Sequence, residues 1–215
     1  MKVIFGTTNR KKIEDLINEA KKMKIDLKVL SLDDIGWNLG EIEEDGLTTE
    51  ENSLIKAKAI YNFCREKGLA LPIITDDSGI FVDTLNGEPG VYTSRYACGG
   101  GEENTELRIY QGVIKLLDKL KCSDNRDATY KCDVTCILPN GTYFQSHGES
   151  QGKIAEEIKG ELKAPYFDSV FILDGQDKSL NDLTPSELED SFRYVAFRNI
   201  LVKLQDRKKE QELER

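Results

Sequence analysis

Apolar residues recur along the first third of the chain with a spacing that changes from strand-like to helix-like. Residues 2–6 form a short apolar run typical of a strand, and a polar turn leads from it into residues 10–23. Four apolar residues of this segment share one helical face and predict an amphipathic helix, namely Ile13, Leu16, Ile17 and Ala20. A second strand is expected at 27–35. The next helix is predicted to end at Gly68, and its apolar positions are Leu54, Ala57, Ile60, Tyr61 and Cys64.

The apolar run at 71–75 predicts a further strand, which we expect to end at Asp76 and Asp77. The remaining expected elements are a helix at 104–120, a hairpin at 127–154 with its turn at 139–141, a strand at 168–173 and a helix at 184–204. The last helix is predicted to have Thr184 as its N-cap and Pro185 in its first turn.

Strands that alternate with helices in this way predict an α/β fold. No internal repeat, low-complexity linker or clean boundary interrupts the pattern. We therefore predict one domain over residues 1–207, followed by a charged tail over residues 208–215 that continues the last helix as a frayed end.

The composition excludes several classes of protein. The formal net charge is −9, whereas general nucleic-acid binding requires a basic surface. A small anion remains a possible ligand, because a few Lys and Arg side chains in one place outweigh a distant acidic surface. A phosphate bound with Mg²⁺ is a ligand of this kind.

The five cysteines are scattered, form no CxxC pair and have a single histidine to assist them. This distribution is expected of packing residues in a reducing cytoplasm rather than of a disulfide framework or a zinc site. No apolar run approaches the length of a membrane span, and no secretory signal is visible. We therefore expect a cytoplasmic protein that does not enter a membrane.

Three segments carry candidate chemistry, and the first is the turn from the first strand into the first helix. Backbone N–H groups at a helix N-terminus suit a phosphate. Thr7 and Asn9 can donate hydrogen bonds, and Lys12 can point back toward the anion. The alternative is ordinary capping by Thr8 or Asn9 with solvated lysines, and this motif alone does not exclude it.

The second segment is the acidic stretch before the helix that ends at Gly68. Glu44, Glu50 and Glu51 are possible ligands for a hard cation, with Lys56 as a nearby positive charge. The alternative is a capping box with Thr49 as the N-cap, since acids are favoured in the first helical turn. That alternative accounts for Glu50 but leaves Glu44 without a structural role.

The third segment is the pair Asp76 and Asp77, placed where α/β sheets usually bind ligands. One of these acids can hold Mg²⁺, and either can accept a proton from water. Ser78 and Gly79 allow the backbone to approach a ligand. A turn that caps the strand explains one aspartate but not two acids followed by a glycine-rich segment.

Taken together, these segments resemble the inosine triphosphate pyrophosphatase family. The resemblance spans nearly the whole chain, and its central motif is highly specific. The matching residues are Thr7, Thr8, Asn9, Arg10, Lys11 and Lys12, then Glu51, Asn52, Ser53 and Lys56, then Asp76, Asp77, Ser78 and Gly79, followed by residues 82–97, 148–154 and 166–171.

The resemblance implies an enzyme that uses Mg²⁺ to cut a noncanonical purine nucleoside triphosphate to its monophosphate and pyrophosphate. Thr7, Asn9 and Lys12 would bind the phosphates together with Lys56. The other substrate-binding residues would be Thr8, Arg10, Lys11 and Ser78. Glu44 and Asp77 would hold the metal, with Asp77 as the proton acceptor. The implied fold is an elongated mixed sheet in two lobes with flanking helices and a central cleft. Family members are commonly homodimers, with residues 87–97 near the interface.

The base-binding residues depart from the family pattern. Phe167 and Asp168 keep an aromatic ring and an acid, but Pro165 replaces the first stacking ring. Glu187 stands where the family has Lys, and Phe192 where it has His, whereas Arg193 is kept to meet a 6-oxo group. His147 belongs to a different segment and is expected to be a surface residue.

An active hydrolase with altered base choice is therefore the preferred interpretation. Two alternatives remain open, a nucleotide-binding relative without catalytic activity and a pyrophosphatase for a different modified nucleotide.

Overall fold

The computed structural model describes residues 1–40, 42–97, 105–160 and 166–213. Pro165 and the segment 98–104, expected from the sequence to be a loop, lie outside these ranges. The helices are α1 (Arg10–Lys22), α2 (Thr49–Glu66), α3 (Thr105–Lys119) and α4 (Phe192–Leu213). The strands are β1 (Lys2–Phe5), β2 (Lys28–Leu30), β3 (Ile73–Val82), β4 (Pro89–Gly90), β5 (Asp127–Ile137), β6 (Tyr143–Ile154) and β7 (Phe171–Leu173).

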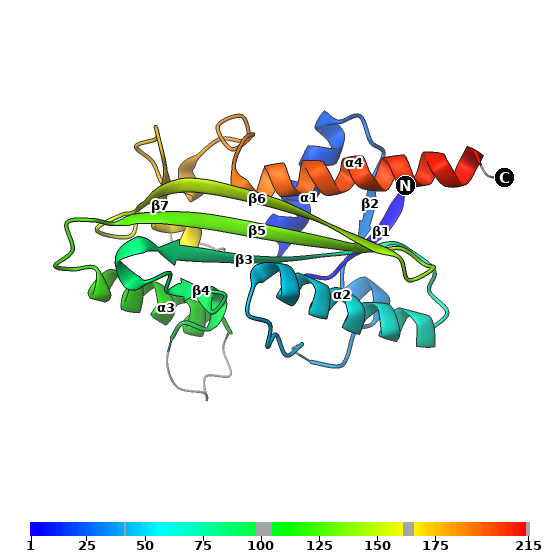
Figure 1. The fold of residues 1–215 in the computed structure, drawn as a ribbon, viewed down its shortest axis with the longest axis horizontal. Coiled ribbons are helices and arrows are strands. Elements are labelled where there is room, and N and C mark those ends of the chain that lie inside the picture. The colour runs from blue at the N-terminus through cyan, green and yellow to red at the C-terminus, as the bar shows by residue number, and fades with distance from the viewer. Residues whose placement is uncertain (41, 98–104, 161–165, 214–215) are drawn as a thin grey trace. The chain divides into compact units, whose positions relative to one another are not determined.

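These strands form one mixed sheet, in which β3, β5 and β6 are the long members (Figure 1). Within the described residues its order is β2-β1-β3-β5-β6-β7, and β4 pairs with β3. The predicted α/β class is confirmed. The chain separates into two compact units, which we call unit 1 (Met1–Asp77, Cys132–Gly148 and Arg193–Arg215) and unit 2 (Ser78–Lys131 and Glu149–Phe192). The single domain over 1–207 stays a prediction.

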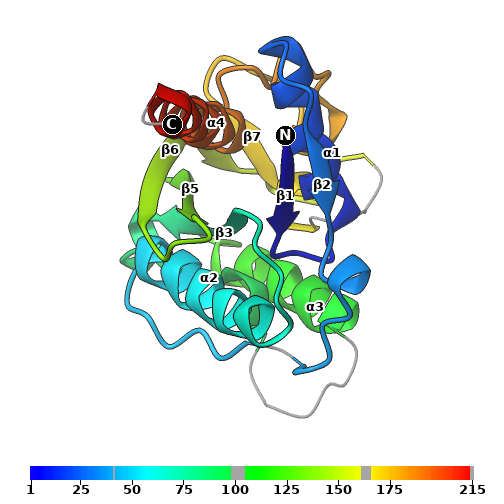
Figure 2. The ribbon, with the colours of Figure 1, turned by 90° about the vertical axis from the view of Figure 1, so that its right-hand side faces the viewer.

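Unit 1 is built around β1, which pairs in parallel with β2 and with the start of β3 (Figure 2). Its core contains a cluster from β1, β3 and α2 that includes Ile4, Ile60 and Ile73. On α4, Phe197 meets Phe5 of β1 edge to face, with 5.7 Å between ring centroids. Burial of these apolar faces holds the helices against the strands.

Unit 2 contains the second half of β3, which pairs antiparallel with β4 through Ile80 and Gly90. The two backbones approach closely here, because a Cβ atom added at Gly79 would lie 2.4 Å from the carbonyl oxygen of Gly90. This pairing extends β3 well beyond the two acids. The prediction that the strand ends at Asp76 and Asp77 is therefore wrong, since β3 continues to Val82.

Two predicted helix starts are also wrong. The N-cap of α2 is Thr48, whose hydroxyl accepts the amide of Glu51, whereas Thr49 is already helical and its hydroxyl donates to Asp133. The last helix begins at Phe192 rather than beside Thr184. Thr184 and Glu187 instead close a local turn, in which the Glu187 carboxylate accepts the amide of Thr184 at 2.7 Å.

Other local predictions are confirmed. Gly68 follows the end of α2 with a φ of +68°, a backbone conformation that glycine adopts without strain. The hairpin turn between β5 and β6 contains Gly141, which also has positive φ. The final helix reaches Leu213, so its last turns include part of the charged tail. No helix in the described part of the chain combines the length and the apolar character needed to cross a membrane.

Candidate active site

The first part of the candidate site lies where β1 leads into α1 in unit 1. Asn9 caps α1, because its side-chain oxygen accepts the amides of Lys11 at 3.0 Å and Lys12 at 3.4 Å. The Thr7 hydroxyl accepts the amide of Asn9 at 3.1 Å. Two of the amides expected to meet a phosphate are thus occupied by the cap. The positive side chain of Lys12 is therefore a better candidate for phosphate binding than these amides, and its ammonium lies 2.6 Å from Asp76.

The other residues of this turn contribute differently. Thr8 and Arg10 are exposed. Lys11 pairs with Asp15, one turn further along α1. Asp15 and Glu19 are almost fully buried beside Leu16 and Ala20, so the buried face of α1 includes two acids that the sequence pattern did not predict.

Asp76 and Asp77 lie inside β3 but just past the end of its neighbour β1, whose last residue, Phe5, is paired with Ile74. Successive strand residues point to opposite faces of a sheet. Accordingly Asp76 meets Lys12 of α1, whereas Asp77 meets residues of α2. The two adjacent acids therefore interact with different helices, Asp76 with α1 and Asp77 with α2. Strand alternation is the signal that would have predicted this division.

Helix α2 brings two polar side chains to Asp77. The Asn52 amide nitrogen donates to Asp77 Oδ2 at 3.3 Å, and Lys56 Nζ lies 3.6 Å from Asp77 Oδ1. Asn52 and Lys56 are four residues apart and so share one face of the helix. Lys56 also lies 3.4 Å from Glu44 Oε1, which joins the acidic stretch to the cluster.

Asn52 was not among the site residues predicted from the sequence. Its side-chain oxygen accepts the amide of Gly46 at 2.9 Å, so one side chain holds both the loop that carries Glu44 and the carboxylate of Asp77. Glu50 and Glu51 are exposed, and the Glu51 carboxylate accepts the amide of Leu47, just before the N-cap of α2. Of the three glutamates considered, only Glu44 pairs with Lys56 among the interactions described.

Burial and the neighbouring charges together shift the pKa values of the residues in this cluster. Burial disfavours the ionised form of Asp76, but Lys12 and Lys56 outweigh it and lower the pKa of Asp76. For Asp77 the effect of burial prevails over the attraction of Lys56, with Glu44 acting in the same direction as burial, and its pKa is raised. Burial also opposes the charge of Lys56, but Asp77 and Glu44 raise the pKa of this lysine. The cluster thus holds Lys56 charged beside a carboxyl group that binds protons more readily than usual.

A buried polar seam, made of side chains between α2 and the sheet, supports this arrangement. The Ser53 hydroxyl lies 2.7 Å from the Thr135 hydroxyl, and the Thr75 hydroxyl donates to the Ser53 carbonyl at 2.6 Å. Asp133 accepts the Thr49 hydroxyl on one oxygen and lies 2.8 Å from His147 Nδ1 through the other. His147 is half exposed, as expected, but it is tied to this seam.

Arg193, the predicted contact for a 6-oxo group, is buried in unit 1. Its NH1 atom lies 3.6 Å from Asp15 Oδ2, and the neighbouring Tyr194 hydroxyl donates to Asp15 Oδ1 at 2.9 Å. Asp15 therefore links the first turns of α1 to the start of α4.

Unit 2 contains the other predicted substrate residues. Ser78 is half-buried in β3, and Phe167 and Asp168 are buried in a 3-10 turn over Tyr166–Ser169. Asp168 accepts the Tyr130 hydroxyl at 3.1 Å. The Phe192 ring is buried and stacks on Tyr130, with 4.0 Å between ring centroids.

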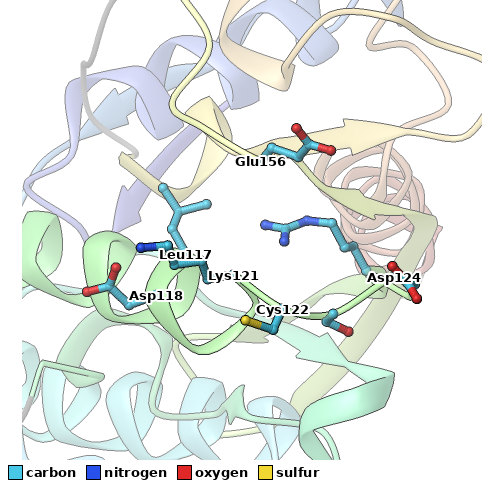
Figure 3. A pocket seen from close by; sticks show the side chains of 8 residues that line it. Leu117, Asp118, Lys121, Cys122, Asp124 and Glu156 are labelled. Carbon is cyan, nitrogen blue, oxygen red and sulfur yellow. The ribbon is translucent and has the colours of Figure 1, made fainter.

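A cavity of about 520 Å³ also lies in unit 2, beside the end of α3, and contains none of these residues (Figure 3). Arg126 lines it, but its guanidinium donates to the carbonyls of Leu120, Ile154 and Ala155. These bonds make Arg126 a structural tie rather than an anion receptor.

Comparison with known proteins identifies the family of this chain. A model of the Ham1 family matches residues 3–203. The chain belongs to the Ham1 family. A dITP/XTP pyrophosphatase of Campylobacter jejuni is 33% identical over 95% of this chain and 98% of its own length. One from Bacillus subtilis is 34% identical over 86% of each chain.

Solved structures of the Ham1 family share the fold. The Ham1 protein of Staphylococcus aureus aligns with a TM-score of 0.74 and 29% identity, covering 96% of this chain and 100% of that one. A HAM1 protein of Coxiella burnetii aligns with a TM-score of 0.73 and 26% identity over 96% and 99%. The resemblance found in the sequence is confirmed.

Proposed function

We propose that this chain is a nucleoside triphosphate pyrophosphohydrolase that converts noncanonical purine nucleotides (ITP, dITP and XTP) to the monophosphate and pyrophosphate. The observation that carries the proposal is the cluster of Asp76, Asp77 and Glu44 with Lys12 and Lys56, in a chain related to dITP/XTP pyrophosphatases along nearly its whole length. Lysines that neutralise phosphate charge and carboxylates that suit a metal are the groups that phosphoryl transfer requires.

Mg²⁺ fits the donor set of this cluster. Glu44 and Asp77 offer hard carboxylate oxygens, which Mg²⁺ prefers. Among the described residues no group of three or more His, Cys, Asp or Glu side chains is arranged to hold a metal. Two carboxylates nevertheless suffice for Mg²⁺, since it usually takes its other ligands from water and substrate phosphates. When bound, it would neutralise charge on the phosphate oxygens.

In the proposed mechanism, different residues of the cluster accept the proton, position the base and bind the phosphates. Asp77 accepts the proton of the attacking water, as a positioned carboxylate can. Asn52 holds this carboxylate in place. Lys12 and Lys56 bind the triphosphate and stabilise negative charge as the bond to pyrophosphate breaks. On substrate binding, the ammonium groups of Lys12 and Lys56 would replace their contacts to the carboxylate oxygens of Asp76 and Asp77 with contacts to phosphate oxygens.

The deciding experiment is an assay of pyrophosphate release from ITP, dITP, XTP, GTP and ATP, with Mg²⁺ and with EDTA. Release from the first three in Mg²⁺ alone supports the proposal. A chain that binds these nucleotides without releasing pyrophosphate would instead be a nucleotide-binding relative.

The assembly and location of the protein belong to the same proposal. We expect a cytoplasmic homodimer, because the resemblance implies a dimer and substrates of this class are found where nucleotides are used. Light scattering after size-exclusion chromatography gives the mass of the particle. A mass near 24.3 kDa would show a monomer and contradict the dimer.

A further inference from the structure

Three residues of unit 2 that are far from Tyr130 in the sequence contact its side chain. Its hydroxyl donates to Asp168 Oδ1 at 3.1 Å. One face of its ring stacks on Phe192 at an interplanar angle of 18°, and Phe171 meets it edge to face with 5.2 Å between centroids. The side chains of Tyr130, Phe192 and Phe171 are all buried, so the ring has a single well-defined orientation.

This packing determines where the hydroxyl group lies. Asp168 is 4% exposed, and a carboxylate at that depth requires hydrogen-bond donors. A phenylalanine at position 130 would fill the same space between Phe192 and Phe171 but would offer no donor. The hydroxyl on Oδ1 restricts rotation of the carboxylate, and this restriction also defines the position of Oδ2.

We infer that Tyr130 is a positioning residue for purine recognition, which acts by orienting Asp168. The inference rests on the proposed function, in which Asp168 contacts the base. A 6-oxopurine carries a hydrogen on N1, which a carboxylate oxygen accepts, whereas adenine presents a lone pair at N1 that a carboxylate repels. An oriented Asp168 therefore favours ITP and XTP over ATP, and a rotating one discriminates less.

The stacking of Phe192 on Tyr130 gives Phe192 a supporting role in this arrangement. Its ring lies against Tyr130 rather than offering a polar group, so the residue that departs from the family pattern supports the tyrosine. Base selection then depends on Asp168 and on the two aromatic rings behind it. The alternative is that the hydroxyl only satisfies a buried acid, which would affect stability but not the choice of base.

The test compares Tyr130→Phe with a matched control in the same unit. Tyr96 is also buried, and its hydroxyl donates to the Glu88 carboxylate at 2.7 Å, so Tyr96→Phe removes the same kind of bond at a position with no proposed role in base binding. The measurement is kcat/KM for ITP and for ATP. We expect the ratio of ITP to ATP to fall about tenfold in Tyr130→Phe, the equivalent of one hydrogen bond to a charged group, and to stay within about twofold in Tyr96→Phe.

Two further measurements separate positioning from stability. If Tyr130 acts through Asp168, then Tyr130→Phe lowers the ratio in the wild-type background but not in an Asp168→Asn background. Phe192→Leu keeps the hydroxyl but removes the stack, so it should lower the ratio as well, and it replaces Tyr130→Phe if that variant does not fold. A thermal stability loss in Tyr130→Phe with an unchanged ratio would overturn the inference.

Failure of the proposed function is recognised separately. It would appear as a wild-type chain that releases no pyrophosphate from any nucleotide. In that event the affinities for ITP and ATP, measured by calorimetry, replace the kinetic ratio. Equal discrimination by the wild type and Tyr130→Phe would then overturn the role of Tyr130.

Discussion

Each of the two adjacent aspartates in β3 has its own lysine. Asp76 faces α1 and lies 2.6 Å from Lys12, whereas Asp77 faces α2 and lies 3.6 Å from Lys56. Because the two carboxylates point to opposite faces of the strand, they are not interchangeable. Only Asp77 is also held by Asn52, in the position proposed for the base and metal ligand.

Asp77→Asn tests this assignment. The substitution keeps the volume of the side chain but removes the proton acceptor and one charged metal ligand. We expect pyrophosphate release to fall by about a hundredfold or more, with the fold intact by circular dichroism. Turnover near the wild-type rate would show that another residue accepts the proton.

The lysines are tested by Lys12→Ala and Lys56→Ala. Both should weaken the binding of ITP much more than that of inosine, because the proposed mechanism assigns these ammonium groups to the phosphates. Calorimetry with both ligands measures the difference. Lys21→Ala is the control, since it removes an exposed positive charge from the last turn of α1. Equal losses for ITP and inosine would point to a structural role instead.

At the scale of elements, α2 carries most of the contacts to Asp77. At its start the Thr48 hydroxyl accepts the amide of Glu51, and the Glu51 carboxylate accepts the amide of Leu47. The buried seam of Ser53, Thr75 and Thr135 ties the helix to the strands. The existence and the end of α2 were predictable from helical spacing and Gly68. The choice of Thr48 over Thr49 as N-cap was not, because it depends on Asp133, which is 84 residues away from Thr49.

Asp133→Asn tests the seam. An amide keeps the shape of the carboxylate but weakens the bonds to Thr49 and His147, which are both made to a charged acceptor. We expect a loss of about 1–3 kcal/mol in the free energy of unfolding, measured in urea. Pyrophosphate release should stay within about threefold of wild type. This variant thus also serves as a control for Asp77→Asn, and an equally severe loss of turnover would place Asp133 in the catalytic machinery.

At the scale of the whole molecule, ligand binding should stabilise the folded chain. A ligand that binds only the folded state adds about 2.7 kcal/mol at a hundred times its Kd. The α,β-imido analogue of ITP resists cleavage and should raise the melting temperature in Mg²⁺ and much less in EDTA. Asp77→Asn should reduce the Mg²⁺-dependent part of this shift. A shift that is the same in Mg²⁺ and EDTA would contradict metal-assisted binding.

The order and type of most elements, the family, and most residues of the proposed phosphate-binding cluster could be read from the sequence alone. These follow from local signals, since helical period, strand alternation, Gly68 and Gly141 act over a few neighbouring residues. The continuation of β3 past its acids was not predictable in this way, because it depends on pairing with β4. Only the tertiary structure decided that Tyr130 meets Asp168, 38 residues away, and that Phe192 stacks behind it. Such contacts depend on sheet register and on side chains from separate elements, and no local pattern in the chain encodes them.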